Sequence, residues 1–175
     1  MKRVAVFGNA GGGKSTLARH MADITKLPLH VVDMMQFWPG GSRVPHGEFL
    51  QAHADLLRQD AWIIDGYGGT ALAWERFAAA DTLVYVDLPL LTHYRWVTKR
   101  LVKGLFSQPP GWPENSPLWS SSIQSYRVLQ QCHRHLTPKY RTLVVESAAS
   151  KQVHHLKSPA QIRTFLASLK EQATR

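Results

Sequence analysis

A chain of 175 residues with 44% hydrophobic and 19% charged residues has the size and composition of one folded domain, which excludes a largely disordered protein. No stretch approaches the roughly 20 consecutive apolar residues that span a bilayer, and the N-terminus becomes glycine-rich too early for a secretory signal. The single cysteine, Cys132, cannot form an internal disulfide, so we expect a cytoplasmic location.

The net charge of +9 is unevenly distributed along the chain. Residues 1–90 hold eight Lys and Arg against nine Asp and Glu, whereas residues 91–175 hold thirteen against three. A basic half suits nucleic acid, an anionic membrane surface or a phosphorylated small molecule as a partner. Composition alone does not choose among them.

Short apolar runs, rich in β-branched residues, alternate with stretches of helical spacing. The runs predict strands at residues 3–8, 29–33, 61–65, 82–87 and 141–146. The spacing predicts helices at residues 16–26, 46–59 and 118–136. Strands that are apolar on both faces and alternate with helices indicate an α/β fold, in which a parallel sheet is covered on both sides.

One segment, residues 104–119, interrupts this alternation with four prolines and two tryptophans. It is too rich in proline for a helix or a central strand. An ordered surface loop and a lid over a binding site both fit this composition, because long loops in compact domains are often functional.

Residues 8–15 match the pattern G-x-x-x-x-G-K-[ST] between a predicted strand and a predicted helix, which is the context that this phosphate-binding motif requires. Its glycines let the backbone wrap a phosphate group with N–H groups turned inward; they are Gly8, Gly11, Gly12 and Gly13. We expect Lys14 to contact the outer phosphates and the Ser15 hydroxyl to bind Mg²⁺. Together with Thr16, these residues predict an ATP site.

Aspartates follow three of the predicted strands, at the edge where ligands of open α/β sheets bind. Carboxylates beside a phosphate site are explained by a magnesium ion or by a substrate hydroxyl that must lose its proton. Asp33 and Asp65 are candidates for these roles, although either could instead cap a turn. Asp87, which precedes Leu88-Pro89, is expected to cap the turn that follows it.

Phosphoryl transfer also needs cations around the moving group. Arg95 and Lys99 lie one turn apart on a predicted helix, with Arg100 beside them. Arg127 and Arg134 are seven residues apart, and so lie on one face of the helix predicted after the proline-rich segment. A solvated basic face is the alternative explanation for these residues.

Several further segments carry a resemblance to a known family. They are residues 14–19, Leu27-Pro28 leading to Asp33, Phe37-Trp38-Pro39-Gly40, Glu48-Phe49, residues 62–67, Ala80-Asp81 and Asp87-Leu88-Pro89. On these residues nearly the whole chain resembles the adenylate-kinase-like branch of the P-loop kinases. More closely, it resembles the group named topology modulation proteins (FlaR-like).

This resemblance implies a P-loop NTPase sandwich of three layers, with a five-stranded parallel sheet whose first strand lies near the centre. It also implies ATP as the phosphoryl donor. Asp65 then takes the position that holds magnesium-bound water in adenylate-kinase-like enzymes. Asp33 falls where related small-molecule kinases keep an acidic group for the acceptor.

The resemblance extends to the basic residues. Arg95, Lys99 and Arg100 match the basic helix that enters the lid, and Arg127 matches the arginine that leaves it. Lys157 falls where such kinases wrap the adenine.

The turn after the third predicted strand departs from the adenylate kinases, which have Asp-Gly-x-Pro-Arg with an arginine that grips the acceptor monophosphate. Here the turn is Asp65-Gly66-Tyr67-Gly68-Gly69, and Arg76 is the nearest replacement. AMP is therefore not assigned as the acceptor. The glycine-rich turn is more similar to that of shikimate-kinase-type enzymes, which phosphorylate an alcohol.

These observations favour a magnesium- and ATP-dependent kinase for a small hydroxylated or phosphorylated metabolite, with a pocket assembled around Asp33, Tyr67 and Arg76. Asp33 or Asp65 would orient or deprotonate the acceptor. Two alternatives stay open: a nucleotide-binding regulator that contacts nucleic acid through its basic half, and a P-loop module that binds nucleotide without transferring a phosphoryl group.

Overall fold

The computed structural model describes residues 1–106 and 118–174. The described strands are β1 (Arg3–Gly8), β2 (Leu29–Val31), β3 (Trp62–Asp65), β4 (Thr82–Val86) and β5 (Gln152–Leu156). The described helices are α1 (Lys14–Thr25), α2 (Val32–Met35), α3 (His46–Leu57), α4 (Thr70–Ala79), α5 (Leu90–Phe106), α6 (Leu118–His135), α7 (Thr137–Ser147) and α8 (Pro159–Ala173).

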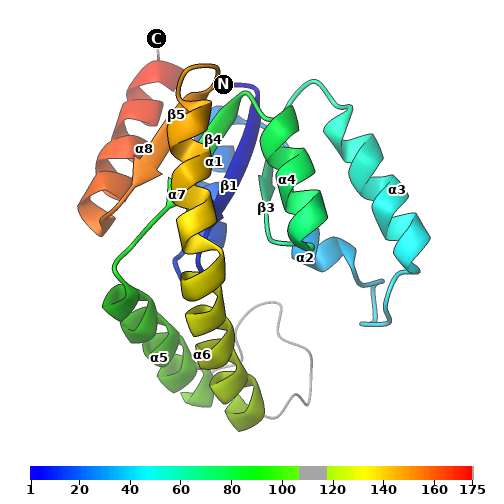
Figure 1. Ribbon diagram of the computed structural model, residues 1–175, viewed down its shortest axis with the longest axis vertical. Coiled ribbons are helices and arrows are strands. Elements are labelled where there is room, and N and C mark those ends of the chain that lie inside the picture. Colours follow the sequence, from blue (N-terminus) through cyan, green and yellow to red (C-terminus); the bar gives the residue numbers. More distant parts are fainter. Residues whose placement is uncertain (107–117, 175) are drawn as a thin grey trace.

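The strands form one parallel sheet in the order β2-β3-β1-β4-β5, so that β1 lies at its centre (Figure 1). Helices connect successive parallel strands, as the geometry of parallel pairing requires. The predicted α/β fold with a central first strand is confirmed.

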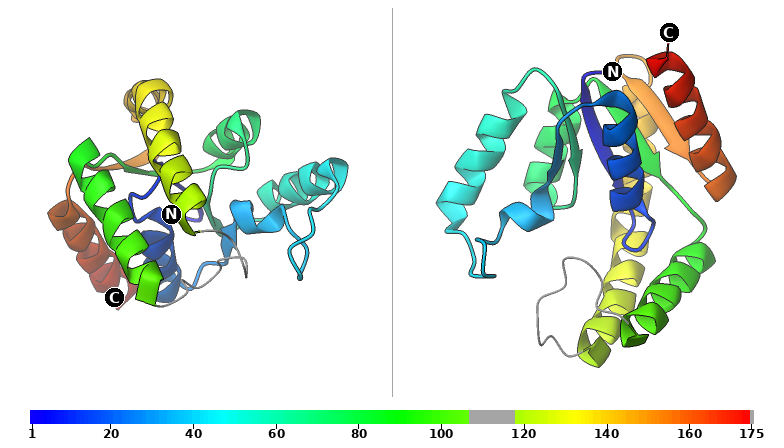
Figure 2. Two further views of the ribbon diagram at one scale, coloured as in Figure 1. Left: turned by 90° about the horizontal axis from the view of Figure 1, so that it is seen from below. Right: turned by 180° about the vertical axis from the view of Figure 1, so that it is seen from behind.

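Helices cover both faces of this sheet (Figure 2). Alternate residues of each central strand pack into different cores, since successive side chains of a strand point to opposite faces. In β1, Val4 and Val6 pack with α1 and α8, whereas Ala5 and Phe7 pack with α4 and α7. The three layers of the sandwich follow from this double burial.

The core on the α4 and α7 side is built largely of aromatic rings. Phe7 lies 4.4 Å from Phe77, 5.1 Å from Tyr85 and 5.1 Å from Tyr140, measured between ring centroids. Trp74 extends the group at 5.3 Å from Phe77. This cluster ends beneath the carboxyl edge of the sheet, where Phe7, Phe77 and Tyr140 line a cavity.

The prediction of a strand at residues 141–146 is wrong. This segment belongs to α7, whose buried residues Thr137, Tyr140, Val144 and Ser147 have helical spacing. Val145 is 75% exposed, as expected for the outer face of a helix and not for a central strand. The fifth strand is β5, which is paired with β4.

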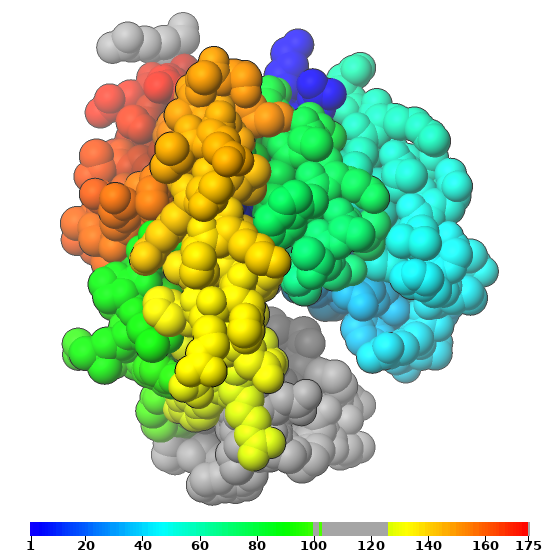
Figure 3. Space-filling model, viewed as in Figure 1, coloured from blue at the N-terminus to red at the C-terminus, as the bar shows by residue number. Residues whose placement is uncertain are grey.

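Two helices extend from the carboxyl edge of the sheet: α5 and α6 pack against each other, and α6 continues nearly in line with α7 (Figure 1). In Figure 3, α6 and α7 form a continuous ridge beside α4. The segment predicted as a lid or loop, residues 104–119, falls mostly outside the described residues. No helix within residues 1–106 and 118–174 is both long and apolar enough to cross a membrane.

Candidate active site

The phosphate loop connects the end of β1 to the start of α1, as predicted. Gly13 is the N-cap of α1, with a φ of 75°, and provides no side-chain cap. No acidic residue lies in the first turn of the helix. The first N–H groups of α1 therefore have neither a side-chain cap nor a nearby carboxylate, and together with the helix dipole they favour an anion.

Close packing explains the glycines at two positions of this loop. A Cβ at Gly8 would overlap the carbonyl oxygen of Val86 in β4, and one at Gly12 would lie 2.7 Å from Cε1 of His93 in α5. Only a residue without a side chain fits between the loop and these neighbours.

His93 is a contact of the phosphate loop that the sequence analysis missed. Its buried ring places Nδ1 2.9 Å from the carbonyl oxygen of Ala10. Burial lowers the pKa of His93 despite this contact, which favours the neutral ring. The signal was present in the sequence, since His93, Trp96 and Val97 have i, i+3, i+4 spacing and together face the loop.

Lys14 lies between two hollows of the surface. Its Nζ donates a hydrogen bond to the carbonyl oxygen of Asn9, at 2.9 Å. With Ser15 and Thr16 it lines the depression over the phosphate loop. It also lines a neighbouring cavity of about 270 Å³ that contains Asp33.

Asp33 is held by the turn that follows β3. It is the second residue of α2, two residues beyond the end of β2, and not at the strand end that was predicted. Its Oδ1 accepts hydrogen bonds from the backbone N–H groups of Tyr67 (3.0 Å) and Gly68 (3.2 Å). Its Oδ2 accepts no hydrogen bond within the part of the chain that the structure describes, so this oxygen is open to a ligand.

Arg76 holds the same turn through hydrogen bonds to its backbone. Its Nη2 donates to the carbonyl oxygens of Gly66 (2.9 Å) and Tyr67 (2.8 Å). Only 2% of Arg76 is exposed, and burial lowers its pKa, opposed in part by Asp33. The residue that seemed the nearest replacement for an acceptor-gripping arginine is thus engaged in holding the turn.

Asp65 fits the predicted role of an outer ligand to magnesium. It ends β3, pairs in register with Val6 of β1, and is 1% exposed. Its Oδ1 has no hydrogen-bond partner among the described residues. A buried carboxylate oxygen without a partner and the Ser15 hydroxyl are ligands that Mg²⁺ prefers, with water completing its shell. The described residues contain no cluster of three or more His, Cys, Asp or Glu that would hold a metal alone.

The cavity beside Lys14 and Asp33 is the pocket predicted around Asp33, Tyr67 and Arg76, and all three line it. Most of its wall is apolar and comes from β1, α4, α6 and α7: Phe7, Ala73, Phe77, Val128, Leu136 and Tyr140. Cys132 also lines it, and burial raises the pKa of its thiol. The contribution of α6 and α7 was missed, although Val128, Cys132 and Leu136 recur every fourth residue.

The structure separates the predicted cationic residues. Arg95 and Lys99 line a depression between α5 and Pro159, at the start of α8, and Trp96 connects it to the phosphate loop. The side chain of Arg100 lies outside the described part of the molecule.

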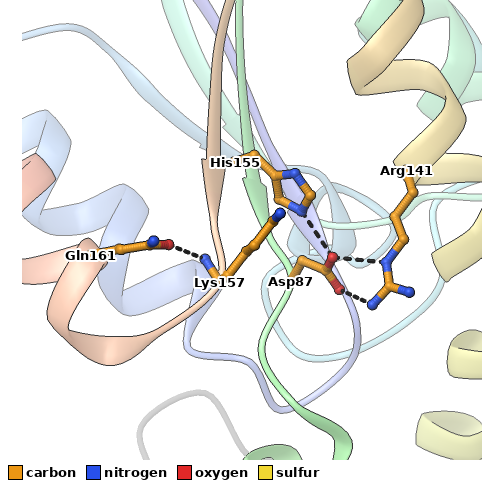
Figure 4. Close-up of polar contacts among 5 residues, drawn as sticks. All are labelled: Asp87, Arg141, His155, Lys157 and Gln161. Carbon is orange, nitrogen blue, oxygen red and sulfur yellow. Dashed lines mark hydrogen bonds and ion pairs between the residues drawn. The ribbon is translucent and has the colours of Figure 1, made fainter.

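The other predicted cations do not reach the phosphate loop. Arg127 and Arg134 line a separate depression on α6. Lys157 does not line the depression beside Pro159, and its backbone N–H donates to Oε1 of Gln161 at 2.6 Å (Figure 4).

Asp87 binds other side chains, and the expectation that it caps a turn is wrong. Its carboxylate accepts two hydrogen bonds from Arg141 of α7 (Nε to Oδ2, 2.8 Å; Nη2 to Oδ1, 3.0 Å). Nε2 of His155 in β5 lies 2.8 Å from Oδ2 (Figure 4). Although burial opposes it, hydrogen bonding to Arg141 and His155 lowers the pKa of Asp87. These contacts join β4, α7 and β5.

Comparison with solved structures identifies the fold. The chain is similar to shikimate kinase from Acinetobacter baumannii in complex with shikimate, with a TM-score of 0.61 and 15% identity over 99% of this chain and 93% of that one. Shikimate kinase from Bacteroides thetaiotaomicron matches with a TM-score of 0.51 and 15% identity over 99% of both chains. No family model matches the chain, and no curated protein matches it.

The chain therefore has the α/β fold of these shikimate kinase structures, with the sheet order that the structure shows. At 15% identity this likeness shows the fold alone. The substrate has to be inferred from the residues of the site.

Proposed function

We propose that this protein is an ATP-dependent kinase that transfers the γ-phosphoryl group to a small-molecule alcohol. The observation that carries the proposal is that Lys14 lines both the depression over the phosphate loop and the cavity that contains Asp33. A terminal phosphate held by the loop would face the Asp33 carboxylate, with Lys14 between them. The structural neighbours, both shikimate kinases, support the same class of reaction.

ATP would bind along two connected depressions. Its phosphates would lie on residues 11–16, which line the first. Its adenine would enter the second, between Arg95 and Lys99 on α5 and Pro159 at the start of α8, with Trp96 at the junction. Lys157 would border this region from the segment that precedes α8.

Ser15 and Asp65 would hold Mg²⁺, Ser15 through its hydroxyl and Asp65 through water. When bound, the ion neutralises charge on the phosphates. Asp65 would contribute through its buried Oδ1, which has no hydrogen-bond partner among the described residues and is available to orient this water.

Asp33 would orient the acceptor hydroxyl through Oδ2 and take its proton as the reaction proceeds. The bond between the hydroxyl oxygen and the γ-phosphorus forms while the bond from phosphorus to the bridging oxygen breaks, which releases ADP. Lys14 and the loop N–H groups would stabilise the charge on the transferred group. Arg100 and Arg127 are proposed to add to this, but Arg127 would have to leave its present depression on α6 to do so.

Replacement of Lys14 tests the ATP site. We expect Lys14→Ala to lower ATP turnover by at least about 100-fold, with an unchanged circular dichroism spectrum. Lys170→Ala, which removes the same group from the exposed face of α8, is the matched control and should keep wild-type turnover. Wild-type turnover by Lys14→Ala would overturn the assignment.

Two finer predictions form part of this proposal. Membership of the topology modulation proteins would agree with the residues that carry the resemblance. A cytoplasmic location would agree with the use of ATP and with a lone, half-buried thiol.

A further inference from the structure

We infer that the acceptor of this kinase is a compact alcohol with an uncharged, apolar or aromatic body, and not a polyol or a phosphorylated metabolite. That this alcohol accepts a phosphoryl group rests on the proposed function. The binding preference itself rests on the cavity beside Asp33, which can be tested without ATP.

The walls of the cavity offer an apolar body a continuous surface. On one side, Val128 and Cys132 of α6 form a single stripe with Leu136, the residue that follows this helix. On the other, Phe7 and Phe77 belong to the aromatic cluster, whose rings are fixed by packing against one another. Rigid aromatic walls favour planar apolar groups, which stack on them or meet their edges.

Several polar groups around this surface are already engaged with the protein. Nη2 of Arg76 donates to two carbonyl oxygens of the turn, and the Tyr67 hydroxyl is bonded to that of Thr70. The buried Nη1 of Arg76 has no hydrogen-bond partner among the described residues. Oδ1 of Asp33 accepts two backbone N–H groups, which leaves Oδ2 for one hydroxyl. A polyol would bring further hydroxyl groups against apolar wall, where they would lose water without gaining a partner.

The charges around the cavity offer no surplus for an anion. The described charged side chains that line it are Lys14, Asp33 and Arg76. Asp33 and Arg76 cancel, and the charge of Lys14 would be engaged by the phosphates of ATP. An acceptor phosphate would therefore meet no free positive charge here.

The volume of the cavity also favours a compact acceptor. The cavity volume of about 270 Å³ lies just below the range for small-molecule pockets, about 300–1,000 Å³. It suits a single ring with a short hydroxyl-bearing arm. It is small for a nucleoside monophosphate.

Cys132 provides a direct test, because it lines the cavity and is the only cysteine of the chain. Alkylation by iodoacetamide would be followed by intact mass, with three compounds as competitors: 2-phenylethanol, shikimate and AMP. We expect 2-phenylethanol, at about ten times its dissociation constant, to slow alkylation about tenfold. Shikimate and AMP at equal concentrations should leave the rate unchanged.

A matched pair of variants shows where protection arises. Val128→Asp places a carboxylate in the apolar wall and should abolish protection by 2-phenylethanol. Val145→Asp makes the same change on the exposed face of α7 and should keep it. Both positions are at least 40% exposed, so neither substitution removes a core residue.

Protection by shikimate or AMP, or no protection by 2-phenylethanol, would overturn the inference. Equal protection in Val128→Asp would do so as well. If 2-phenylethanol protects Cys132 but no phosphoryl transfer to any alcohol is found, the proposed function fails while the binding preference stands.

Discussion

At the scale of single residues, Asp33 depends on a chain of contacts through the turn after β3. Arg76 holds the carbonyl oxygens of Gly66 and Tyr67, and the N–H groups of Tyr67 and Gly68 hold the Asp33 carboxylate. The buried guanidinium of Arg76 thus orients the Asp33 carboxylate through the peptide groups of the turn, without contacting it. Arg76 is a positioning residue in this arrangement.

The turn makes a specific prediction for Gly66. A Cβ there would lie 3.0 Å from the backbone nitrogen of Asp33 and 3.1 Å from its Cγ and Oδ2. We expect Gly66→Ala to displace the carboxylate and lower kcat for phosphoryl transfer about 100-fold, with little change in the KM for ATP. Steady-state kinetics with varied ATP would measure both.

Gly69→Ala is the control for backbone strain. Gly69 has a φ of 113° against 108° for Gly66, but a Cβ there would meet nothing within 4 Å. The same positive φ should cost both variants similar stability, so a kcat for Gly66→Ala as high as that of Gly69→Ala would refute the role of the turn.

Sequence reasoning reached some of these residues because their signals are local. Lys14 and Ser15 belong to a contiguous motif whose context was also predicted. The convergence of Asp33, Tyr67 and Arg76 was expected, but the direction of the Arg76 guanidinium depends on tertiary packing. No local pattern shows that a buried arginine will bond to a turn ten residues before it.

At the scale of elements, one helix and one strand show why the fold was only partly predictable. Residues 141–146 are rich in β-branched residues, which favours a strand by propensity, yet the buried positions of α7 recur with helical period. Strand β5 contains two consecutive histidines and lacks an apolar run. His154 packs on Phe165, at 4.6 Å between ring centroids, and His155 binds Asp87. These partners come from other elements, so the sequence of β5 did not indicate its place in the sheet.

The contacts of Asp87 make a prediction about how β4, α7 and β5 are joined. The carboxylate is nearly buried and bonded to Arg141 and His155. We expect Asp87→Asn to lower the free energy of unfolding by about 2 kcal/mol, because one charged acceptor serves both partners. Urea unfolding at pH 7 would measure the change.

Asp55→Asn is the matched control, since it breaks the exposed pair of Asp55 with Arg58. An exposed pair contributes little, so this change should stay within about 0.5 kcal/mol. Equal effects of the two substitutions would show that the contacts of Asp87 do not stabilise the fold.

At the scale of the whole molecule, the basic half of the chain serves several purposes. Arg141 binds Asp87, and Lys151 donates to the carbonyl oxygens of Ala78 and Ala80. Arg95 and Lys99 border the proposed adenine site. Other basic residues are exposed, among them Lys139, Arg163 and Lys170. Binding of nucleic acid through them stays a prediction, and it would weaken steeply with salt, by about 0.9 log units per log unit for each phosphate contact.

Buried and half-buried histidines make the stability of the fold depend on pH. Burial lowers the pKa of His30, His53, His93 and His154 below the ordinary 6.5. Below pH 6.5 the unfolded chain therefore binds protons that the folded protein does not. The free energy of unfolding consequently decreases as the pH is lowered. Each histidine contributes at most about 1.4 kcal/mol per pH unit. The lowered pKa values of Asp81 and Asp87 add a further loss as the pH falls through 3.8 and below.

Replacement of His53 tests whether these histidines cause the pH dependence of stability. Neither ring nitrogen has a hydrogen bond among the described residues, and Glu75 lies 3.8 Å from Nδ1. Urea midpoints between pH 5 and 7.5 should show a shallower dependence in His53→Leu than in the wild type. His46→Leu, at the exposed start of the same helix, should keep the wild-type dependence, and equal slopes in all three proteins would contradict the explanation.

The central claim is that the phosphate loop and Asp33 act on the same phosphoryl group. It is tested most directly by following γ-³²P from ATP in the presence of a panel of alcohols. We expect wild-type protein to place the label on an alcohol, and Asp33→Asn to bind ATP normally while losing at least about 100-fold in transfer. Label that appears only as inorganic phosphate, or undiminished transfer by Asp33→Asn, would contradict the claim.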